Sequence, residues 1–183
     1  VDTETSSLNP QEAELIGISI SYAANVSFYI PLGHKDTKGI KKELVLKKLK
    51  TILEDSSIKK VGQNIKYDFI IFKNYGIELN SIEDTMLLSY TLDAGNNRHN
   101  MDTLSELHLG HKTISYKDLV GTGKKKLNFS DIKLKAATEY AAEDADVTLR
   151  LYNILSERVS EEKLDKIYEV FEKPMIKILS KLE

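Results

Sequence analysis

Residues 14–22 carry the pattern that most restricts the fold of this chain. In this stretch, ELIGISISY, three isoleucines (Ile16, Ile18 and Ile20) alternate with small or polar residues, which is the period of a β-strand. Residues 26–32, VSFYIPL, have the character of a second strand, and Ala24-Asn25 is expected to turn between the two. The first part of the chain therefore predicts a β-hairpin.

Helical patterns dominate the rest of the sequence. The expected elements are a helix over 42–54, a short strand at KKVGQ, a helix at NIKYDFIIFKNYG that stops at Gly76, a helix at EDTMLLSYTLDAG that ends before Gly95, the segment MDTLSELHLG, a flexible basic loop over 121–130, a long helix from about 133 to 158, and a last amphipathic helix that Pro174 should kink or interrupt. This order of elements, with strands first and helices after them, predicts an α/β or α+β domain with one central sheet.

The composition is that of one globular domain. The 183 residues are 30% charged and 41% hydrophobic, which allows a sizeable core. The net charge of −2 gives no global sign of a polyanionic partner. The absence of cysteine excludes disulfides and thiolate metal sites and favours a reducing compartment, and no apolar run approaches a membrane span. Because VDTET reads as the end of a strand, we expect the chain to have been cut from a longer protein.

Three acids gather on the long expected helix, at Glu143, Asp144 and Asp146. At roughly 100° per residue, Asp144 lies in the middle of the apolar stripe that contains Leu151 and Leu155. Glu143 and Asp146 point elsewhere and are expected to face solvent. An ionised carboxylate on a buried stripe is costly unless a cation or hydrogen-bond donors meet it.

The helix before Gly76 gives the same result for Asp68. With Asp68 as origin, Phe72 and Asn64 lie within roughly 40° of it, so this carboxylate also falls on a core-facing stripe. Each inward acid has a polar companion one turn earlier, which is Asn64 for Asp68 and Tyr140 for Asp144.

Asp2 and Glu4 add two further carboxylates. Residues two apart on a strand share a face, and like charges there repel unless something positive lies between them. Taken alone, Asp2-Thr3-Glu4 is a polar strand end, and Asp68 or Asp144 a salt-bridge partner. Together, four inward carboxylates with no cysteine and no histidine cluster favour hard cations such as Mg²⁺ or Mn²⁺. Two such ions about 4 Å apart suit phosphodiester cleavage.

The segments DTET, GQNIKYD and YAAEDAD resemble the three exonuclease motifs of the DEDD superfamily in its tyrosine variant. The resemblance is closest to the 3′→5′ proofreading exonuclease domains of the bacterial DNA polymerase I (family A) type. It covers the whole chain and includes NYGIEL, DTMLLSY, RHNMDTL, GHKTIS and FEKPM. It implies a single 3′→5′ exonuclease domain over residues 1–183 with a ribonuclease H-like fold, a mixed central β-sheet flanked by α-helices.

The resemblance also implies a set of catalytic residues. Asp2, Glu4, Asp68 and Asp144 look like the acids that hold two divalent metal ions, Mg²⁺ or Mn²⁺, and Tyr140 resembles the tyrosine that orients the attacking water. The implied reaction is hydrolysis of DNA from its 3′ end with release of nucleoside 5′-monophosphates, in DNA replication and repair.

Residues that contact the substrate are implied in the same way. The matching positions are Thr5 and Leu8, which grip the terminal nucleotide, with Leu8 as a wedge, and Gln63, Asn64, Tyr67, Met86, Arg98 and Tyr116 near the single strand. Tyr116 stands where a phenylalanine is common, which leaves base stacking there open. Asn100 stands where an aspartate is frequent, and no consequence is attached to it.

Other charged residues have weaker signals. Lys124, Lys125 and Lys126 fit either phosphate contacts or a solvated loop. The lysine pairs at 41–42, 47–48 and 59–60 are expected on helix surfaces, and the four histidines, which lack ligand spacing, are expected on the surface or in the core.

The implied partners are a single-stranded 3′ end of DNA and a polymerase module of the same chain beyond Glu183. We expect a monomer in the bacterial cytoplasm with no membrane association. Two alternatives stay open. One is an RNA exonuclease of the RNase D kind, which shares the three motifs, and the other is a catalytically silent DNA-binding scaffold.

Overall fold

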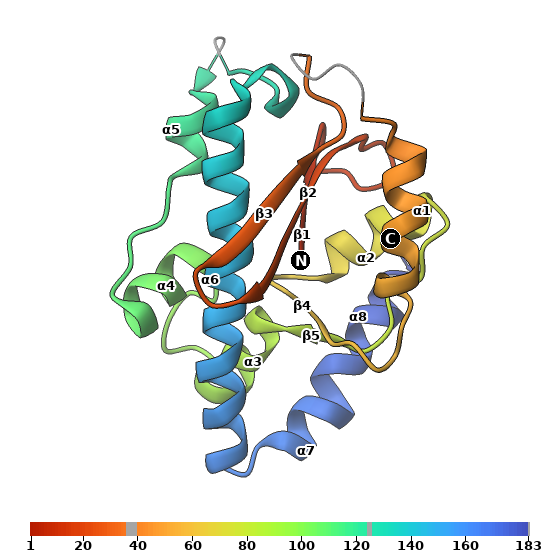
Figure 1. The fold of residues 1–183 in the computed structure, drawn as a ribbon. Coiled ribbons are helices and arrows are strands. Elements are labelled where there is room, and N and C mark those ends of the chain that lie inside the picture. Colours follow the sequence, from red (N-terminus) through yellow and green to blue (C-terminus); the bar gives the residue numbers. More distant parts are fainter. Residues whose placement is uncertain (36–39, 124–125, 183) are drawn as a thin grey trace.

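The computed structural model describes residues 1–35, 40–123 and 126–182, and in it helices lie on both sides of a group of strands (Figure 1). The strands are β1 (Asp2–Thr5), β2 (Leu15–Ala23), β3 (Val26–Pro31), β4 (Lys60–Gly62) and β5 (Ile82–Asp84). The helices are α1 (Lys42–Leu53), α2 (Lys66–Asn74), α3 (Thr85–Asp93), α4 (Met101–Leu109), α5 (Tyr116–Val120), α6 (Leu134–Glu161), α7 (Asp165–Ile167) and α8 (Lys173–Leu179), with a short 3₁₀-helix at Phe129–Asp131 and a π-helix at Tyr168–Glu172.

The predicted hairpin is confirmed. Strands β2 and β3 pair antiparallel, and Asn25 makes the turn between them with a left-handed φ of 63°. Strand β1 pairs antiparallel with the other edge of β2, so that Glu4 lies opposite Gly17. The long middle strand thus supports the short strand that carries the first two acids.

Strands β4 and β5 form a separate parallel pair. They adjoin the antiparallel sheet where the Val1 nitrogen donates to the Val61 carbonyl at 2.7 Å. The mixed α/β class is confirmed, but the sheet is in two parts. Lys60 belongs to β4 and is buried, with its ammonium group donating to the Asp55 and Ile58 carbonyls, so its predicted place on a helix surface was wrong.

Helix α6 is the long helix that the periodicity predicts, and it packs against β2 and β3 as well as α3 and α4. Helices α1, α2 and α8 lie on the other side of the strands (Figure 1). Within the described chain, no helix has both the length and the apolar composition of a membrane span.

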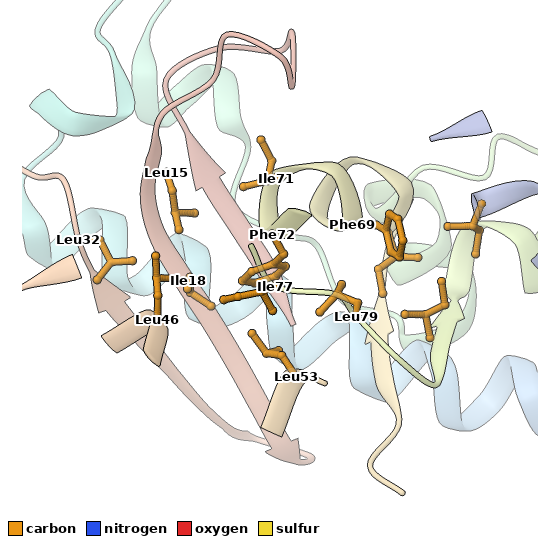
Figure 2. Packing of buried hydrophobic residues seen from close by; sticks show 13 residues of the cluster. Leu15, Ile18, Leu32, Leu46, Leu53, Phe69, Ile71, Phe72, Ile77 and Leu79 are labelled. Atoms are coloured by element: carbon orange, nitrogen blue, oxygen red, sulfur yellow. The ribbon is translucent and has the colours of Figure 1, made fainter. Parts of the chain in front are cut away.

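The main hydrophobic cluster lies between the sheet and helices α1 and α2. Its fully buried members include Leu15, Ile18, Ile71 and Phe72, which interdigitate in Figure 2. A second cluster joins α6 to α3 and α4 around Leu104. Because α6 is covered on two sides, residues on more than one of its faces are buried.

Two local predictions were wrong, and one short helix was missed. Glu83 and Asp84 were placed in a helix, but they end strand β5, and Asp84 is the N-cap of α3, accepting from the backbone nitrogens of Met86 and Leu87. Asn64 was placed in a helix, but it precedes α2 with a left-handed φ of 56°. Helix α5 was not predicted. Elements of three to five residues are too short to display a period, which is why they escaped the sequence patterns.

The expected effect of Pro174 is confirmed. The π-helix at Tyr168–Glu172 interrupts the C-terminal helix, and regular α-helix resumes at Lys173 with the proline in its first turn. Proline has no N–H to donate and is tolerated at this position of a helix.

Gly17 is a position where the packing requires glycine. A Cβ atom there would lie 2.0 Å from the hydroxyl oxygen of Tyr29 and 2.3 Å from its ring. We expect Gly17→Ala to lower the free energy of unfolding by about 1–3 kcal/mol, because the phenol ring must move. Chemical denaturation measures the change. In a Tyr29→Leu background the same substitution should cost less, and an equal cost in both backgrounds would contradict the steric explanation.

Candidate active site

A cleft of ≈ 700 Å³ opens at the end of β1 where Glu4 lies. Its walls come from β1 and the segment that follows it, from the start of α2, from α5 and the loop after it, and from α6. All four acids that the sequence singles out, and Tyr140, line this cleft. The fold therefore brings together residues that are up to 142 positions apart, between Asp2 and Asp144.

Three of the acids form a compact group. Asp2, Glu4 and Asp144 each offer a carboxylate oxygen, and these oxygens lie within 4.8 Å of one another. Glu4 and Asp144 are buried, and Asp2 is half-buried. The buried Oδ1 atom of Asp144 has no hydrogen-bond partner within the described ranges, and none of the three pairs there with a lysine or arginine. An unpartnered buried carboxylate oxygen among other carboxylates fits a bound cation.

Asp68 reaches the same cleft from α2 and is tied to β1. Its Oδ1 atom accepts hydrogen bonds from the backbone nitrogen of Thr3 at 2.9 Å and from the Thr3 hydroxyl at 2.5 Å. Thr3 lies between Asp2 and Glu4, so Asp68 is held on the strand that carries both acids. These two hydrogen bonds use one oxygen of a carboxylate that itself lines the cleft.

The acids raise one another's pKa values. Burial raises the pKa of Asp2 to about 6. Burial, and then the charges of Asp2, Asp144 and Asp68, raises the pKa of Glu4 well above its usual range. Burial, and then the charge of Asp2, does the same to the pKa values of Asp68 and Asp144. The protein alone therefore disfavours the fully ionised cleft, and a divalent cation would reverse that preference.

Tyr140 lies one turn before Asp144 on α6. Burial, and then the charges of Asp144 and Glu4, raises the pKa of its hydroxyl far above the usual value, so this group stays protonated at neutral pH. Its ring contacts Tyr116, with centroids 5.9 Å apart, and Phe129 at 6.1 Å. A protonated phenol held by two rings can orient a water molecule by hydrogen bonding, but it does not serve as a base.

The segment after β1 is fixed to α2. The Tyr67 hydroxyl donates to the Ser7 carbonyl at 2.5 Å and lies 2.5 Å from the Thr5 hydroxyl. These bonds fold the chain so that Leu8, which is 91% exposed, stands at the rim of the cleft. This exposed leucine therefore lies on a segment fixed to α2 and lines the same cleft as the acids.

Comparisons with known proteins identify the family. The model of the 3′–5′ exonuclease family matches residues 1–160. The chain belongs to this family. The exonuclease domain is 45% identical over 202 residues to DNA polymerase I of Rhizobium leguminosarum and 41% identical over 184 residues to DNA polymerase I of Borreliella burgdorferi, and it covers 20% of each of these proteins. It thus corresponds to the 3′–5′ exonuclease domain of DNA polymerase I and spans about a fifth of the length of these relatives.

Solved structures confirm the fold. The structure of Brucella melitensis NrnC has a TM-score of 0.73 at 21% identity, with 98% of this chain and 80% of that chain covered. The polymerase Pol1 of M. smegmatis, in complex with DNA primer-template and dNTP, has a TM-score of 0.69 at 18% identity, with 92% and 25% covered. The exonuclease domain therefore has the ribonuclease H-like fold that the sequence implies.

The remaining predicted contacts of the exonuclease domain divide into two groups. Thr5, Leu8, Gln63, Asn64, Tyr67 and Tyr116 line the cleft. Met86, in the first turn of α3, and Arg98, before α4, are absent from the lining formed by the described residues. The Gln63 side chain is engaged within the protein, since its amide donates to the His99 carbonyl at 2.7 Å.

Along α5 and the loop after it, Lys126 was named from the sequence as a possible phosphate contact, whereas Lys117 and Phe129 were not. Lys117, Lys126 and Phe129 line the cleft of the exonuclease domain, and the Lys126 ammonium lies 5.6 Å from the centre of the Tyr116 ring. Lys124 and Lys125 lie outside the described residues. The expected basic loop was the signal for Lys126. Phe129 is a single aromatic residue in a polar loop, and no sequence pattern indicated that it lines the cleft.

The solvent-facing positions predicted for Glu143 and Asp146 were wrong. Asp146 is buried and accepts from the Asn25 nitrogen at 2.5 Å, which attaches the hairpin turn to α6. Glu143 accepts from the Ile114 nitrogen at 2.6 Å and bonds the His111 ring at 2.8 Å. Helix phase correctly places Glu143 and Asp146 on other faces of α6 than Asp144. Those faces are also covered by the rest of the fold.

The raised pKa values predict how stability depends on pH. The cleft acids bind protons more tightly in the folded domain than in the unfolded chain. At a pH between an acid's pKa in the unfolded chain and its raised pKa in the folded domain, the folded state therefore holds more protons. Without divalent metal, we expect the free energy of unfolding to fall as the pH rises from about 4 and to go on falling beyond about 6. Denaturation measured at a series of pH values tests this.

The matched variant is the double substitution Asp2→Asn with Asp144→Asn, which should flatten this pH dependence. Adding Mn²⁺ should stabilise the wild-type domain at pH 7 and above, because the ion binds only the folded cleft. A stability that rises with pH across this window, or the same slope in the double variant, would show that these acids do not carry the repulsion.

Proposed function

We propose that the domain is a metal-dependent 3′→5′ exonuclease that hydrolyses single-stranded DNA ends and releases nucleoside 5′-monophosphates. The observation that carries the proposal is the group of carboxylate oxygens from Asp2, Glu4 and Asp144, within 4.8 Å of one another in an open cleft. Membership of the 3′–5′ exonuclease family supports it. Relatives that are DNA polymerases favour proofreading of DNA, in replication and repair, next to a polymerase module of the same chain.

Hard oxygen ligands suit Mg²⁺ or Mn²⁺. Asp2, Glu4 and Asp144 would hold one ion, and Asp2 with Asp68 would hold a second. When bound, the ions supply charge neutralisation for the phosphodiester and lower the pKa of the attacking water. A structure of Brucella melitensis NrnC, which has a similar fold, is described with bound Mg²⁺, and this supports the choice of ion.

The protein's own residues orient the reactants. The Tyr140 hydroxyl, which stays protonated, holds the attacking water through a hydrogen bond. Leu8 packs against the terminal base, and Tyr116 offers a ring from the wall at α5. Lys117 and Lys126 lie along that wall, where lysines attract backbone phosphates. Stacking and phosphate contacts tolerate any base sequence.

Discrimination of mispaired ends would come from melting. The cleft takes up an unpaired 3′ end, and freeing a paired base from a duplex costs a few kcal/mol. Freeing a mismatched end costs less free energy because it is already partly unstacked. The domain needs no contact that reads base identity to favour mismatched ends.

A second candidate substrate is a short RNA or a dinucleotide. One structure with similar fold is Brucella melitensis NrnC bound to pGG, with a TM-score of 0.72 over 98% of this chain. Identity to that protein is 21%, against 45% to a DNA polymerase I, so DNA is the preferred proposal.

The reaction is tested with a 5′-labelled single-stranded oligonucleotide and Mg²⁺. We expect a ladder that shortens one nucleotide at a time, faster cutting of a mismatched than a matched duplex end, and no reaction when a bulky group blocks the 3′ end. Asp144→Asn should lower the rate more than about 100-fold, because it removes a ligand of the proposed metal. Internal cuts in a circular strand, or digestion from the 5′ end, would exclude the proposal, and a strong preference for RNA or for pGG would favour the second candidate.

Tyr140→Phe keeps the ring and removes only the hydroxyl. Loss of one hydrogen bond to the attacking water should reduce kcat about tenfold. The affinity for single-stranded DNA should stay the same, because the ring and its contacts with Tyr116 and Phe129 are preserved. Single-turnover kinetics and DNA titration separate the two effects, and Tyr22→Phe is the control, because the Tyr22 side chain is 73% exposed on β2. A wild-type rate in Tyr140→Phe would remove this hydroxyl from the mechanism.

A further inference from the structure

The turn between β4 and α2 decides where Asp68 lies. It runs over Gly62–Ile65, and α2 starts at the next residue, so Tyr67 and Asp68 fall in the first turn of the helix. Asn64 has a left-handed φ of 56° in this turn, a conformation that asparagine adopts more readily than most residues but that still has a cost. Such a turn needs external support to keep one conformation.

Asp84 supplies that support from the end of β5. Its Oδ1 accepts from the Asn64 nitrogen at 3.1 Å and its Oδ2 from the Ile65 nitrogen at 2.9 Å. The same Oδ1 accepts from the Met86 nitrogen at 2.8 Å as the N-cap of α3. The carboxylate is therefore shared between a helix cap and the turn that leads to the second acid motif. Asp84 is 1% exposed and, unlike Asp68, does not line the cleft.

The next residue, Thr85, holds the other half of the turn. Its hydroxyl oxygen lies 2.5 Å from Oε1 of Gln63 and 3.2 Å from the Gly62 carbonyl oxygen. Thr85 is fully buried. The side chains of Asp84 and Thr85 together thus contact each residue of the turn. Asp84 accepts from two of its backbone nitrogens, and the Thr85 hydroxyl lies near two of its oxygen acceptors.

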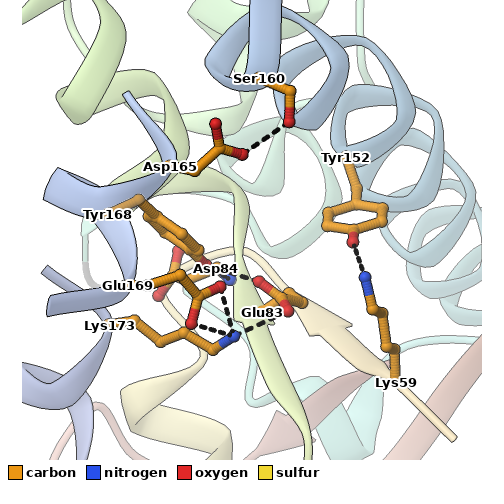
Figure 3. A network of polar contacts seen from close by, with 9 residues as sticks. All are labelled: Lys59, Glu83, Asp84, Tyr152, Ser160, Asp165, Tyr168, Glu169 and Lys173. Atoms are coloured by element: carbon orange, nitrogen blue, oxygen red, sulfur yellow. Dashed lines mark hydrogen bonds and ion pairs between the residues drawn. The ribbon is translucent and has the colours of Figure 1, made fainter. Parts of the chain in front are cut away.

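A buried polar network fixes Asp84 in turn (Figure 3). The Asp84 nitrogen donates to the Tyr168 hydroxyl at 3.0 Å, and this hydroxyl donates to Glu83 at 3.0 Å. The other oxygen of Glu83 accepts from the Lys173 ammonium at 2.8 Å. The support of the turn therefore extends to the C-terminal helices.

We propose that Asp84 and Thr85 are positioning residues for the acid motif on α2, which keep Asp68 against Thr3 and Tyr67 against Ser7. They touch neither substrate nor metal, and they act by fixing the backbone from which these two side chains extend. This inference rests on the proposed function for its effect on metal binding, but its effect on the position of Asp68 is measurable without metal.

Asp84→Ser separates the two roles of the carboxylate. Serine is a good N-cap, so α3 keeps its cap, but its single short hydroxyl cannot also reach Asn64 and Ile65. The matched control is Asn100→Ser, because Asn100 is an exposed N-cap that accepts from the Thr103 nitrogen at 3.0 Å and does not contact the turn. Thr85→Val, which keeps the shape and removes the hydroxyl, is a milder variant if Asp84→Ser fails to fold.

Hydrogen exchange without metal is the first measurement. The Thr3 amide donates to Asp68, so its exchange rate reports whether Asp68 is in place. We expect the amides of Thr3, Asn64 and Ile65 to exchange faster in Asp84→Ser and Thr85→Val, and at the wild-type rate in Asn100→Ser. Wild-type exchange at all three amides in folded Asp84→Ser or Thr85→Val would overturn the inference.

Calorimetric titration with Mn²⁺ is the second measurement. Mutation of a residue that holds a metal ligand in place typically lowers metal affinity by about 10- to 100-fold. We therefore expect Asp84→Ser to weaken Mn²⁺ binding about tenfold or more. In an Asp68→Asn background the same substitution should add little, because both changes act through one carboxylate. Equal weakening in both backgrounds would overturn the inference. A wild-type domain that binds no Mn²⁺ would instead overturn the proposed function, and the exchange result would still stand.

Discussion

Mutual repulsion among buried carboxylates is the constraint on which the rest of this structure depends. Glu4, Asp68 and Asp144 are buried, and each has a pKa raised first by burial and then by the other acids. Carboxylates free to move would separate or turn to solvent. They stay together because each extends from a different rigid element, and Asp68 is bonded to the strand that carries Asp2 and Glu4. A cation among these carboxylates would relieve that repulsion.

Helix α6 shows how one short acidic segment serves three purposes. Asp144 faces the cleft, Asp146 holds the hairpin turn through Asn25, and Glu143 holds the segment before α5 through Ile114. The second and third contacts fix the sheet and the aromatic wall relative to the same helix. A helix that bears a cleft acid thus also anchors the hairpin turn and the segment before α5.

The aromatic residues of the cleft have a related arrangement. Tyr140 lies between Tyr116 and Phe129, and Phe129 contacts Tyr29, whose ring covers Gly17 opposite Glu4. The rings therefore extend from the wall of the cleft to β2, the strand beside the one that carries Asp2 and Glu4.

The sequence by itself determined the hairpin, the long helix and the inward faces of Asp68 and Asp144, because strand and helix periods are local and these elements are long enough to show them. Tertiary structure decided what depends on contacts between distant segments: strand β5, the turn at Asn64, the role of Asp84, and the burial of Asp146. Strand β5 has three residues, too few to show a period. The side of a helix opposite its apolar stripe appears solvent-exposed from sequence alone, but α6 is covered by the sheet on one side and by α3 and α4 on another, so only the assembled fold could decide that Asp146 is buried.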